Sequence, residues 1–323
     1  MSEKFVEVKD LHVQYSSDRQ IVHAVNGVSF DIDKGETLGL VGETGAGKTT
    51  IAKAILRILP DPPAKVTGGE IWLDGEDLLK KPEREMLSIR GGKVAMIFQD
   101  PMTALNPTMT VGSQISEVVL LHNEGLTKRQ AEERTVEMLE LVGIPAIRYG
   151  EYPHQFSGGM KQRVVIAMAL ACNPELLLAD EPTTALDVTI QAQVLAMIRT
   201  LKEQLGTSVI LITHDLGVVA SMCQTVAVTY AGEIVEYGTT AHIFDNAQHP
   251  YTIGLFGSLP DLKSKSKRLK PIPGLMPDPT KLPAGCKFSE RCPHATERCR
   301  MEAPPVVETE PGHLVRCDLM KGE

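Results

Sequence analysis

The stretch ETLGLVGETGAGKTTIAKAILRIL, residues 36–59, limits the folds open to this chain more than any other. Its first part, Thr37–Val41, predicts a buried strand. The pattern Gly-x4-Gly-Lys-Thr follows, which is the phosphate-loop pattern of nucleotide-binding proteins. The next apolar residues repeat at helical spacing: Ile51, Ile55, Ile58 and Leu59. A strand, a glycine loop and a helix in this order predict an α/β fold that binds a nucleoside phosphate.

The residues of this loop have the chemistry that phosphate binding requires. Gly42, Gly45 and Gly47 let the backbone turn its N–H groups inward around an anion, and the helix N-terminus adds partial positive charge. Lys48 can reach the β- and γ-phosphates, and Thr49 offers a hydroxyl to Mg²⁺. The alternative is a glycine-rich turn without a ligand, which the flanking strand and helix disfavour.

A pair of acids narrows the class of nucleotide-binding protein. The apolar run Leu176–Ala179 ends in Asp180 and Glu181, so a buried strand is expected to deliver two carboxylates to its carboxyl edge. Asp180 is placed to hold Mg²⁺ through water, and Glu181 to orient or deprotonate an attacking water. A solvated acid pair is the alternative, but acids at the end of such a run are costly without a cation nearby.

A second glycine motif, Ser157-Gly158-Gly159, opens a segment that is polar at first and then almost wholly apolar. Exposed N–H groups at the start of such a helix form a second anion site. With the phosphate loop, this motif resembles the signature of the ATP-binding cassette ATPases, although Phe156 and Met160 stand where leucine and glutamine are commonest. In that family the two motifs face each other across a head-to-tail dimer. The resemblance therefore implies that the signature contacts the γ-phosphate held by a partner subunit.

The other motifs of this family follow in order along the chain. The resemblance implies that Gln99 contacts Mg²⁺ and the attacking water, that His214 contacts the γ-phosphate, and that Asp187 crosses the dimer interface. It places Tyr15 against the adenine ring; taken singly, Tyr15 and His214 could equally be structural residues. The catalytic set is Glu181, His214 and Gln99, and the Mg²⁺ set is Thr49, Gln99 and Asp180. The ATP-binding set is Tyr15, Gly42, Thr44, Gly45, Ala46, Gly47, Lys48, Thr49 and Thr50.

The organisation of the chain follows the same pattern. Residues 1–238 are expected to form the ATPase domain, with a mainly parallel core sheet, an antiparallel β part and a helical subdomain at about 100–160. Thr127 is a candidate cap for one long helix, and Gly206 a candidate stop for another. The resemblance implies that the helical subdomain docks on coupling helices of a membrane protein. Residues 239–323 are expected to form a C-terminal extension.

Composition and charge exclude other classes of protein. The net charge of −8 gives no general attraction to nucleic acid, so none is expected as a partner. The charged N-terminus lacks the apolar core of a secretion signal, and no stretch approaches the roughly 18 apolar residues that span a bilayer. A cytoplasmic protein is therefore expected. The basic run Lys263–Lys270 is expected to be a solvated linker, with contact to lipid headgroups as the alternative.

The segments NAQHPYTIGLFGSLP, PIPGLMPDP and CKFSERCPHATERC resemble, in order, the C-terminal extension of the ATPases that power dipeptide and oligopeptide importers. The resemblance implies a peripheral motor at the cytoplasmic face of the membrane, with two transmembrane permease subunits and, indirectly, a peptide-binding receptor. A second, related ATPase is expected as the dimer partner, with a homodimer as the alternative. Import of nickel or another small solute is the alternative function. A cassette ATPase of DNA repair or translation is disfavoured, because neither a coiled-coil insertion nor a second cassette is present.

Four of the six cysteines lie in the extension: Cys286, Cys292, Cys299 and Cys317. Their spacing matches neither a zinc ribbon nor a standard ferredoxin run, so it leaves zinc, iron–sulfur, disulfides and free thiols open, with His294 and His313 as candidate substitute ligands. The resemblance implies a [4Fe–4S] cluster. Because the extension is rich in proline and poor in apolar residues, a metal centre is the expected source of its folding energy. Cys172 and Cys223 are expected to be buried and inert.

Overall fold

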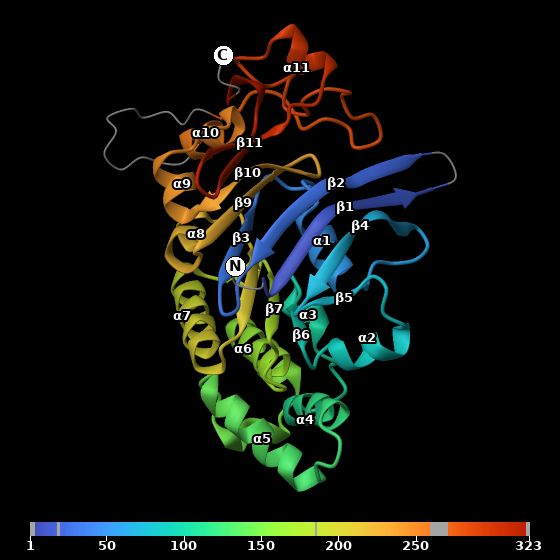
Figure 1. Cartoon of the computed structure of the whole chain (residues 1–323). Helices are drawn as coiled ribbons and strands as arrows, with labels where there is room; N and C mark the ends of the chain where they lie inside the picture. Colours follow the sequence, from blue (N-terminus) through green and yellow to red (C-terminus); the bar gives the residue numbers. More distant parts are fainter. Residues whose placement is uncertain (1–3, 18–19, 185, 259–270, 321–323) are drawn as a thin grey trace. The chain divides into compact units, whose positions relative to one another are not determined.

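The computed structural model describes residues 4–17, 20–184, 186–258 and 271–320 (Figure 1). These residues form two compact units. The first unit contains residues 32–37 and 80–218. The second contains residues 4–31, 38–79 and everything described from residue 219 onward. The predicted linker Lys263–Lys270 lies outside the described residues. Within the described ranges, no helix is both long enough and apolar enough to cross a bilayer.

Three parallel strands form the centre of the first unit. They are β6 (Val94–Ile97), β7 (Leu176–Asp180) and β8 (Ser208–Ile212), with β7 in the middle. All five residues of β7 are buried, as expected for a parallel strand covered on both faces. Because parallel strands end at the same edge of a sheet, the residues that follow β6, β7 and β8 are brought together.

The helices of the first unit are α2 (Glu83–Ile89), α3 (Pro101–Ala104), α4 (Val111–His122), α5 (Lys128–Leu141), α6 (Gly158–Leu170) and α7 (Val188–Leu205), with 3₁₀ turns at Ala146–Gly150 and Pro153–Gln155. Helices α4 and α5 lie side by side (Figure 1). A capping box confirms Thr127 as the cap of α5, because its side chain accepts from Gln130 N and the Gln130 side chain accepts from Thr127 N. Gly206, with φ of 68°, ends α7 as predicted. Helix α8 (Leu216–Met222) runs from this unit into the other.

The second unit contains two groups of strands. One sheet has the order β2-β1-β4-β5, built from β1 (Val6–Ser16), β2 (Ile21–Ile32), β4 (Ala64–Leu73) and β5 (Glu76–Asp77). The other strands have the order β11-β12-β10-β9-β3, built from β3 (Thr37–Val41), β9 (Thr225–Tyr230), β10 (Glu233–Thr239), β11 (Val306–Glu310) and β12 (His313–Arg316). Strands β3 and β9 are parallel, whereas β9, β10, β12 and β11 pair antiparallel. Parallel and antiparallel pairing are therefore both present, as predicted.

The first helix of the second unit, α1 (Lys48–Ile55), is shorter than the sequence pattern predicted. Arg57 adopts a positive φ of 52°, which an α-helix cannot accommodate, so the chain turns away after Leu56. Ile58 and Leu59 consequently lie beyond the helix and are only half-buried. The remaining helices of this unit are α9 (Thr240–Asp245), α10 (Pro250–Gly257) and α11 (Glu297–Met301), followed by a 3₁₀ turn at Asp318–Met320.

The C-terminal extension is held by protein contacts that the sequence did not predict. The hairpin β11–β12 continues the sheet through β10, where Glu236 pairs with Val315. Rings from α10, β9 and the cysteine segment pack together, with centroids 4.7 Å apart for Tyr230 and Tyr251 and 5.2 Å for Tyr230 and Phe288. The expectation that a metal centre must supply the folding energy of the extension was therefore wrong in part, because a sheet and an aromatic cluster also hold it.

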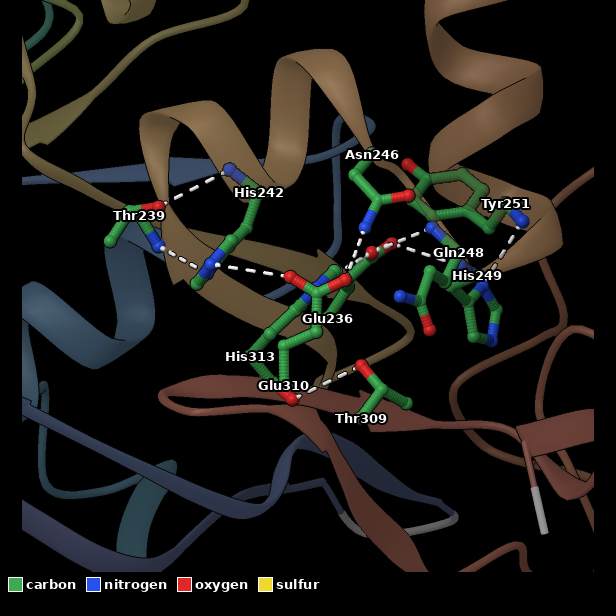
Figure 2. Close-up of polar contacts among 10 residues, drawn as sticks. All are labelled: Glu236, Thr239, His242, Asn246, Gln248, His249, Tyr251, Thr309, Glu310 and His313. Carbon is green, nitrogen blue, oxygen red and sulfur yellow. Dashed lines mark hydrogen bonds and ion pairs between the residues drawn. The ribbon is translucent and has the colours of Figure 1, made fainter. Parts of the chain in front are cut away.

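A polar network centred on a buried Glu236–His313 pair joins the hairpin to β10 (Figure 2). Glu236 and His313 are both 0% exposed, and Oε1 of Glu236 lies 2.8 Å from Nε2 of His313. The same oxygen accepts from Gln248 N at 2.8 Å, and Oε2 accepts from His249 N at 3.0 Å. The ring of His313 stacks on that of His242, with centroids 4.8 Å apart. His313, a predicted substitute metal ligand, is thus engaged by a carboxylate instead.

Candidate nucleotide site

The phosphate loop of the second unit has the backbone of an anion cradle. Gly42, Gly45 and Gly47 have φ of 150°, 85° and 97°, values that residues with side chains rarely adopt. A Cβ on Gly42 would lie 2.2 Å from the Thr229 carbonyl oxygen, and one on Gly47 would lie 2.4 Å from that of Ala24. Only glycine fits at these two positions, so the loop is built as the sequence predicted and its residues suit a phosphate group.

Lys48 is folded into this loop. Its ammonium group donates to the carbonyl oxygens of Gly42 at 2.8 Å and Glu43 at 2.9 Å, and the residue is 6% exposed. Ala46, fully buried, donates its N–H to the same Glu43 oxygen at 3.2 Å. A phosphate oxygen offers a stronger, charged acceptor to an ammonium group than a carbonyl does. A phosphate bound in the loop could therefore replace these carbonyl oxygens as the acceptor for the Lys48 ammonium group.

The other predicted nucleotide-binding residues surround the start of α1. Tyr15, on β1, is half-buried, and its hydroxyl lies 3.4 Å from Oγ1 of Thr50. Thr44 is exposed, and Thr49 is half-buried in the first turn of the helix. Tyr15 is thus beside the phosphate loop although 35 residues separate it from Thr50, which is consistent with a role in holding the nucleotide.

Three predicted catalytic residues meet in the first unit, at the carboxyl ends of its parallel strands. Oε1 of Glu181 lies 2.6 Å from Nε2 of His214, which follows β8. Oε2 of Glu181 accepts from Nε2 of Gln99, which follows β6, at 2.7 Å. The Glu181 side chain is 13% exposed, so it is screened from bulk solvent but open on one side. A carboxylate held by two side chains in this way can accept a proton from a water molecule.

The backbone at Glu181 is also special. Its φ is 48°, in the left-handed region that a residue with a side chain seldom adopts, and its N–H donates to the Ile212 carbonyl at 2.9 Å. Thr184 donates its hydroxyl to Oε2 of Glu181 at 2.9 Å, a contact that the sequence did not predict. Asp180, the last residue of β7, is 3% exposed. The strand thus ends in two carboxylates at its carboxyl edge, as its pattern predicted, and one of them is buried.

The signature motif caps a helix of the first unit. The Ser157 hydroxyl accepts from Met160 N at 3.4 Å at the start of α6, and Asp187 accepts from Ile190 N at 3.0 Å at the start of α7. A Cβ on Gly159 would lie 2.7 Å from a methyl group of Ile190, so the two helix starts adjoin. Gly158 is exposed, with open space where a side chain would be. The predicted signature residues and Asp187 are therefore neighbours.

The two departures from the commonest signature share one partner. The guanidinium carbon of Arg148 lies 4.3 Å from the ring centre of Phe156, and Nη1 of Arg148 lies 3.2 Å from the Met160 sulfur. Arg148 also pairs with Glu151 at 2.6 Å. Both substitutions thus pack on one arginine side chain and leave the serine and glycines unchanged.

The four cysteines of the extension line one pocket, together with His249, Phe288 and His294. The cavity between these side chains has a volume of about 20 Å³. The backbone N–H of Cys286 donates to the Cys299 carbonyl at 2.8 Å. Burial, and then the charges of the other three thiols, raise the pKa of Cys286 to about 11. Burial also raises the pKa values of Cys292 and Cys317.

This arrangement does not itself form an ion-binding site. Among the residues that the structure describes, no group of three or more His, Cys, Asp or Glu side chains is arranged to hold a metal ion. All six cysteines are described, and none forms a disulfide. Cys223 is buried as expected, but Cys172 is only half-buried, contrary to the prediction, with its sulfur 3.6 Å from the Val118 carbonyl oxygen.

A phosphate loop, a signature helix and a Gln-Glu-His set define an ATPase of the ATP-binding cassette class. A family profile described as "ABC transporter" matches residues 25–184, and one described as "Oligopeptide/dipeptide transporter, C-terminal region" matches residues 235–299. Curated proteins of this kind are similar over nearly the whole chain. The chain therefore belongs to the ATP-binding proteins of the oligopeptide and dipeptide ABC transporter family.

Two relatives from Bacillus subtilis (strain 168) illustrate the similarity. The oligopeptide transport ATP-binding protein OppD is 51% identical over 320 residues, which are 98% of this chain and 89% of that protein. The dipeptide transport ATP-binding protein DppD is 50% identical over 317 residues, or 98% and 94% of the two chains. Among solved structures, the ATP-binding cassette MJ0796, a dimer in a post-hydrolysis state bound to ADP and Pi, has a TM-score of 0.66 at 28% identity, covering 73% of this chain and 98% of that chain.

Proposed function

We propose that this protein is the motor subunit of a peptide importer. The observation that carries the proposal is the combination of the Gln99–Glu181–His214 set with an extension that matches the C-terminal region of oligopeptide and dipeptide transporters. The motor acts at the cytoplasmic face of the membrane with two permease subunits, and indirectly with a peptide-binding receptor. Its ATPase partner is a second, related subunit.

The residue roles follow from chemistry and position. Lys48 and the loop glycines bind the phosphates, and Tyr15 packs against the adenine. Mg²⁺, when bound, screens the phosphate charge, and Thr49, Gln99 and Asp180 are the residues that would hold it. Glu181 accepts the proton of the attacking water, and His214, whose Nε2 lies 2.6 Å from Oε1 of Glu181, contacts the γ-phosphate.

The signature acts in trans. Ser157, Gly158 and Gly159 present a helix N-terminus, and Asp187 lies beside it at the start of α7. An exposed helix start with no side chain at Gly158 leaves room for a phosphate that another subunit holds. The dimeric state of the similar cassette MJ0796 supports a head-to-tail pair of this kind. ATP then works by stabilising the closed dimer over the open one.

A groove between α4 and α5 suits the docking of a permease helix. It is open, has a volume of about 530 Å³, and is lined by Ser113, Ser116, Glu117, Leu120, Leu121, Lys128, Glu132 and Tyr149. Leu121 is 74% exposed and the neighbouring Leu120 is half-buried, so the groove offers apolar surface to a partner. A short amphipathic helix would place its apolar side on the leucines and its polar ends near Glu117 and Lys128.

Transport measured in vesicles tests whether the imported substrate is a peptide. We expect a reconstituted assembly of this chain, its partner ATPase and the permeases to take up labelled dipeptides or longer peptides when receptor and MgATP are supplied. Hydrolysis should rise severalfold when the receptor carries peptide. Uptake of nickel without uptake of any peptide would overturn the peptide assignment and favour the alternative solute. A stoichiometry of two copies of this chain per assembly would replace the heterodimer by a homodimer.

We further propose that the four-cysteine pocket takes up a [4Fe–4S] cluster. Four thiols border one space, yet they do not converge on a single ion position. Zinc also accepts four thiolates, and the cluster is favoured by the resemblance of this extension to those of peptide-importer ATPases. Burial, and then the charges of the neighbouring thiols, raise the pKa of Cys286 to about 11, so cluster binding would have to displace a proton from this thiol.

Metal analysis after anaerobic purification distinguishes these alternatives. We expect about four irons and four acid-labile sulfides per chain and a brown colour, all lost in Cys292→Ser. Cys172→Ser, outside the extension, is the matched control and should retain the iron. A colourless protein with one zinc per chain would replace the cluster by zinc, and a metal-free protein that folds normally would eliminate both.

A further inference from the structure

Arg291 is a buried cation between the cysteine segment and the phosphate loop. Its side chain is 6% exposed, and Nη1 lies 3.0 Å from Oε2 of Glu43, the second residue of the loop. The same nitrogen donates to the Tyr230 hydroxyl at 3.3 Å. Nε donates to the Pro273 carbonyl at 3.0 Å, and Nη2 to that of Ile272 at 3.4 Å. Every guanidinium nitrogen thus has a partner, so the group is fixed in place.

Glu43 is held by its backbone as well as by its side chain. Its N–H donates at 3.0 Å to the hydroxyl of Tyr251, a fully buried residue of α10. Its carbonyl oxygen accepts from the Lys48 ammonium at 2.9 Å and from Ala46 N at 3.2 Å. Glu43 therefore contacts Arg291 and Tyr251 of the C-terminal extension on one side. On the other side it contacts Lys48 and the backbone of Ala46, which lie at the phosphate position.

The cysteine segment sets the position of Arg291. Arg291 and Cys292 both donate their backbone N–H groups to the Phe288 carbonyl, at 3.0 and 2.9 Å, and Ser289 donates to that of Cys286 at 3.0 Å. This turn carries two of the four cysteines. The guanidinium carbon also lies 5.9 Å from the centre of the Phe288 ring, which the same turn buries. Distortion of the turn would therefore move the guanidinium.

We propose that Arg291 is a positioning residue for ATP binding, which holds the phosphate loop through Glu43 and makes the shape of that loop depend on the folded cysteine segment. A charge-assisted hydrogen bond at a buried position is among the stronger polar contacts in a protein. A loop already fixed in its binding shape loses less conformational entropy when a ligand arrives. The proposal rests on the assignment of the ATP phosphates to this loop.

Two single substitutions in the full-length protein each remove the ion pair between Arg291 and Glu43, one at each partner. Arg291→Gln changes the extension, and Glu43→Gln changes the loop without touching the cysteine turn. We expect each to weaken MgATP binding, measured by calorimetry, and to raise KM for ATP about tenfold, with kcat at saturating ATP unchanged. The double variant should be no weaker than either single variant. Amide exchange of residues 41–48 should become faster in all three.

Arg300→Gln is the matched control, because Arg300 is an exposed arginine of the same extension and its replacement makes the same change in charge. It should bind MgATP like the wild type. Equal affinity of Glu43→Gln and the wild type for MgATP would overturn the proposal. If only Arg291→Gln lost affinity for MgATP, the folding of the extension, and not the Arg291–Glu43 contact, would be what matters for binding. If the wild type itself failed to bind MgATP, the assignment of the ATP site would fail instead.

Discussion

Replacement of Glu181 by glutamine is expected to slow ATP hydrolysis about 1,000-fold while leaving MgATP binding intact. Glutamine has the shape of glutamate and can still meet His214 and Gln99, whose nitrogens lie 2.6 and 2.7 Å from the two carboxylate oxygens. It cannot take the proton of the attacking water. Because ATP binds but is not cleaved, the dimer should stay closed. Single-turnover hydrolysis and size-exclusion chromatography with MgATP measure the two effects.

Glu203→Gln provides the control for this change. Glu203 is exposed on α7 of the same unit, so its substitution alters net charge equally without reaching the strand ends. Its hydrolysis rate should equal that of the wild type. Hydrolysis at the normal rate by an assembly in which both sites carry the glutamine would refute the role of Glu181 as the base.

Parallel strand pairing explains why the three residues assigned to the catalytic set lie together, because parallel strands end at the same edge of a sheet. An apolar run followed by acids identified β7, whereas Gln99 and His214 were assigned from the resemblance to the ATP-binding cassette ATPases. Once β6, β7 and β8 pair in parallel, Gln99, Glu181 and His214 must fall at one edge. Local signals also predicted the cap at Thr127, since a capping box involves residues only three apart.

Contacts between distant segments could not be predicted in this way. Glu43 and Arg291 are 248 residues apart, and no sequence pattern around either residue predicts that the two make contact. The hairpin β11–β12 was missed because a proline-rich composition and a half-exposed, partly charged strand gave no clear apolar signal. Cysteine spacing likewise left the state of the four thiols open, because a spacing of thiols in sequence does not fix the distances between them in space.

The buried network around Glu236 should make a large contribution to the stability of the extension. We expect Glu236→Gln to lower the free energy of opening the β11–β12 hairpin by about 3 kcal/mol, because loss of one partner leaves a buried polar group uncompensated. Oε1 accepts from His313 and Gln248 and Oε2 accepts from His249, whereas an amide can accept at only one of its two ends. Its NH₂ group would then face an N–H donor.

Hydrogen exchange resolves this effect locally. Amides of β12 should exchange about 100-fold faster in Glu236→Gln, which is the rate equivalent of 3 kcal/mol, and protease should cut the hairpin sooner. Glu290→Gln, the same change at an exposed position of the extension, should leave exchange unaltered. Protection of β12 unchanged in Glu236→Gln would mean that strand pairing and the aromatic cluster of Tyr230, Tyr251 and Phe288 suffice to hold the hairpin. Faster exchange of the β12 amides would instead show that the Glu236 carboxylate holds the hairpin on β10.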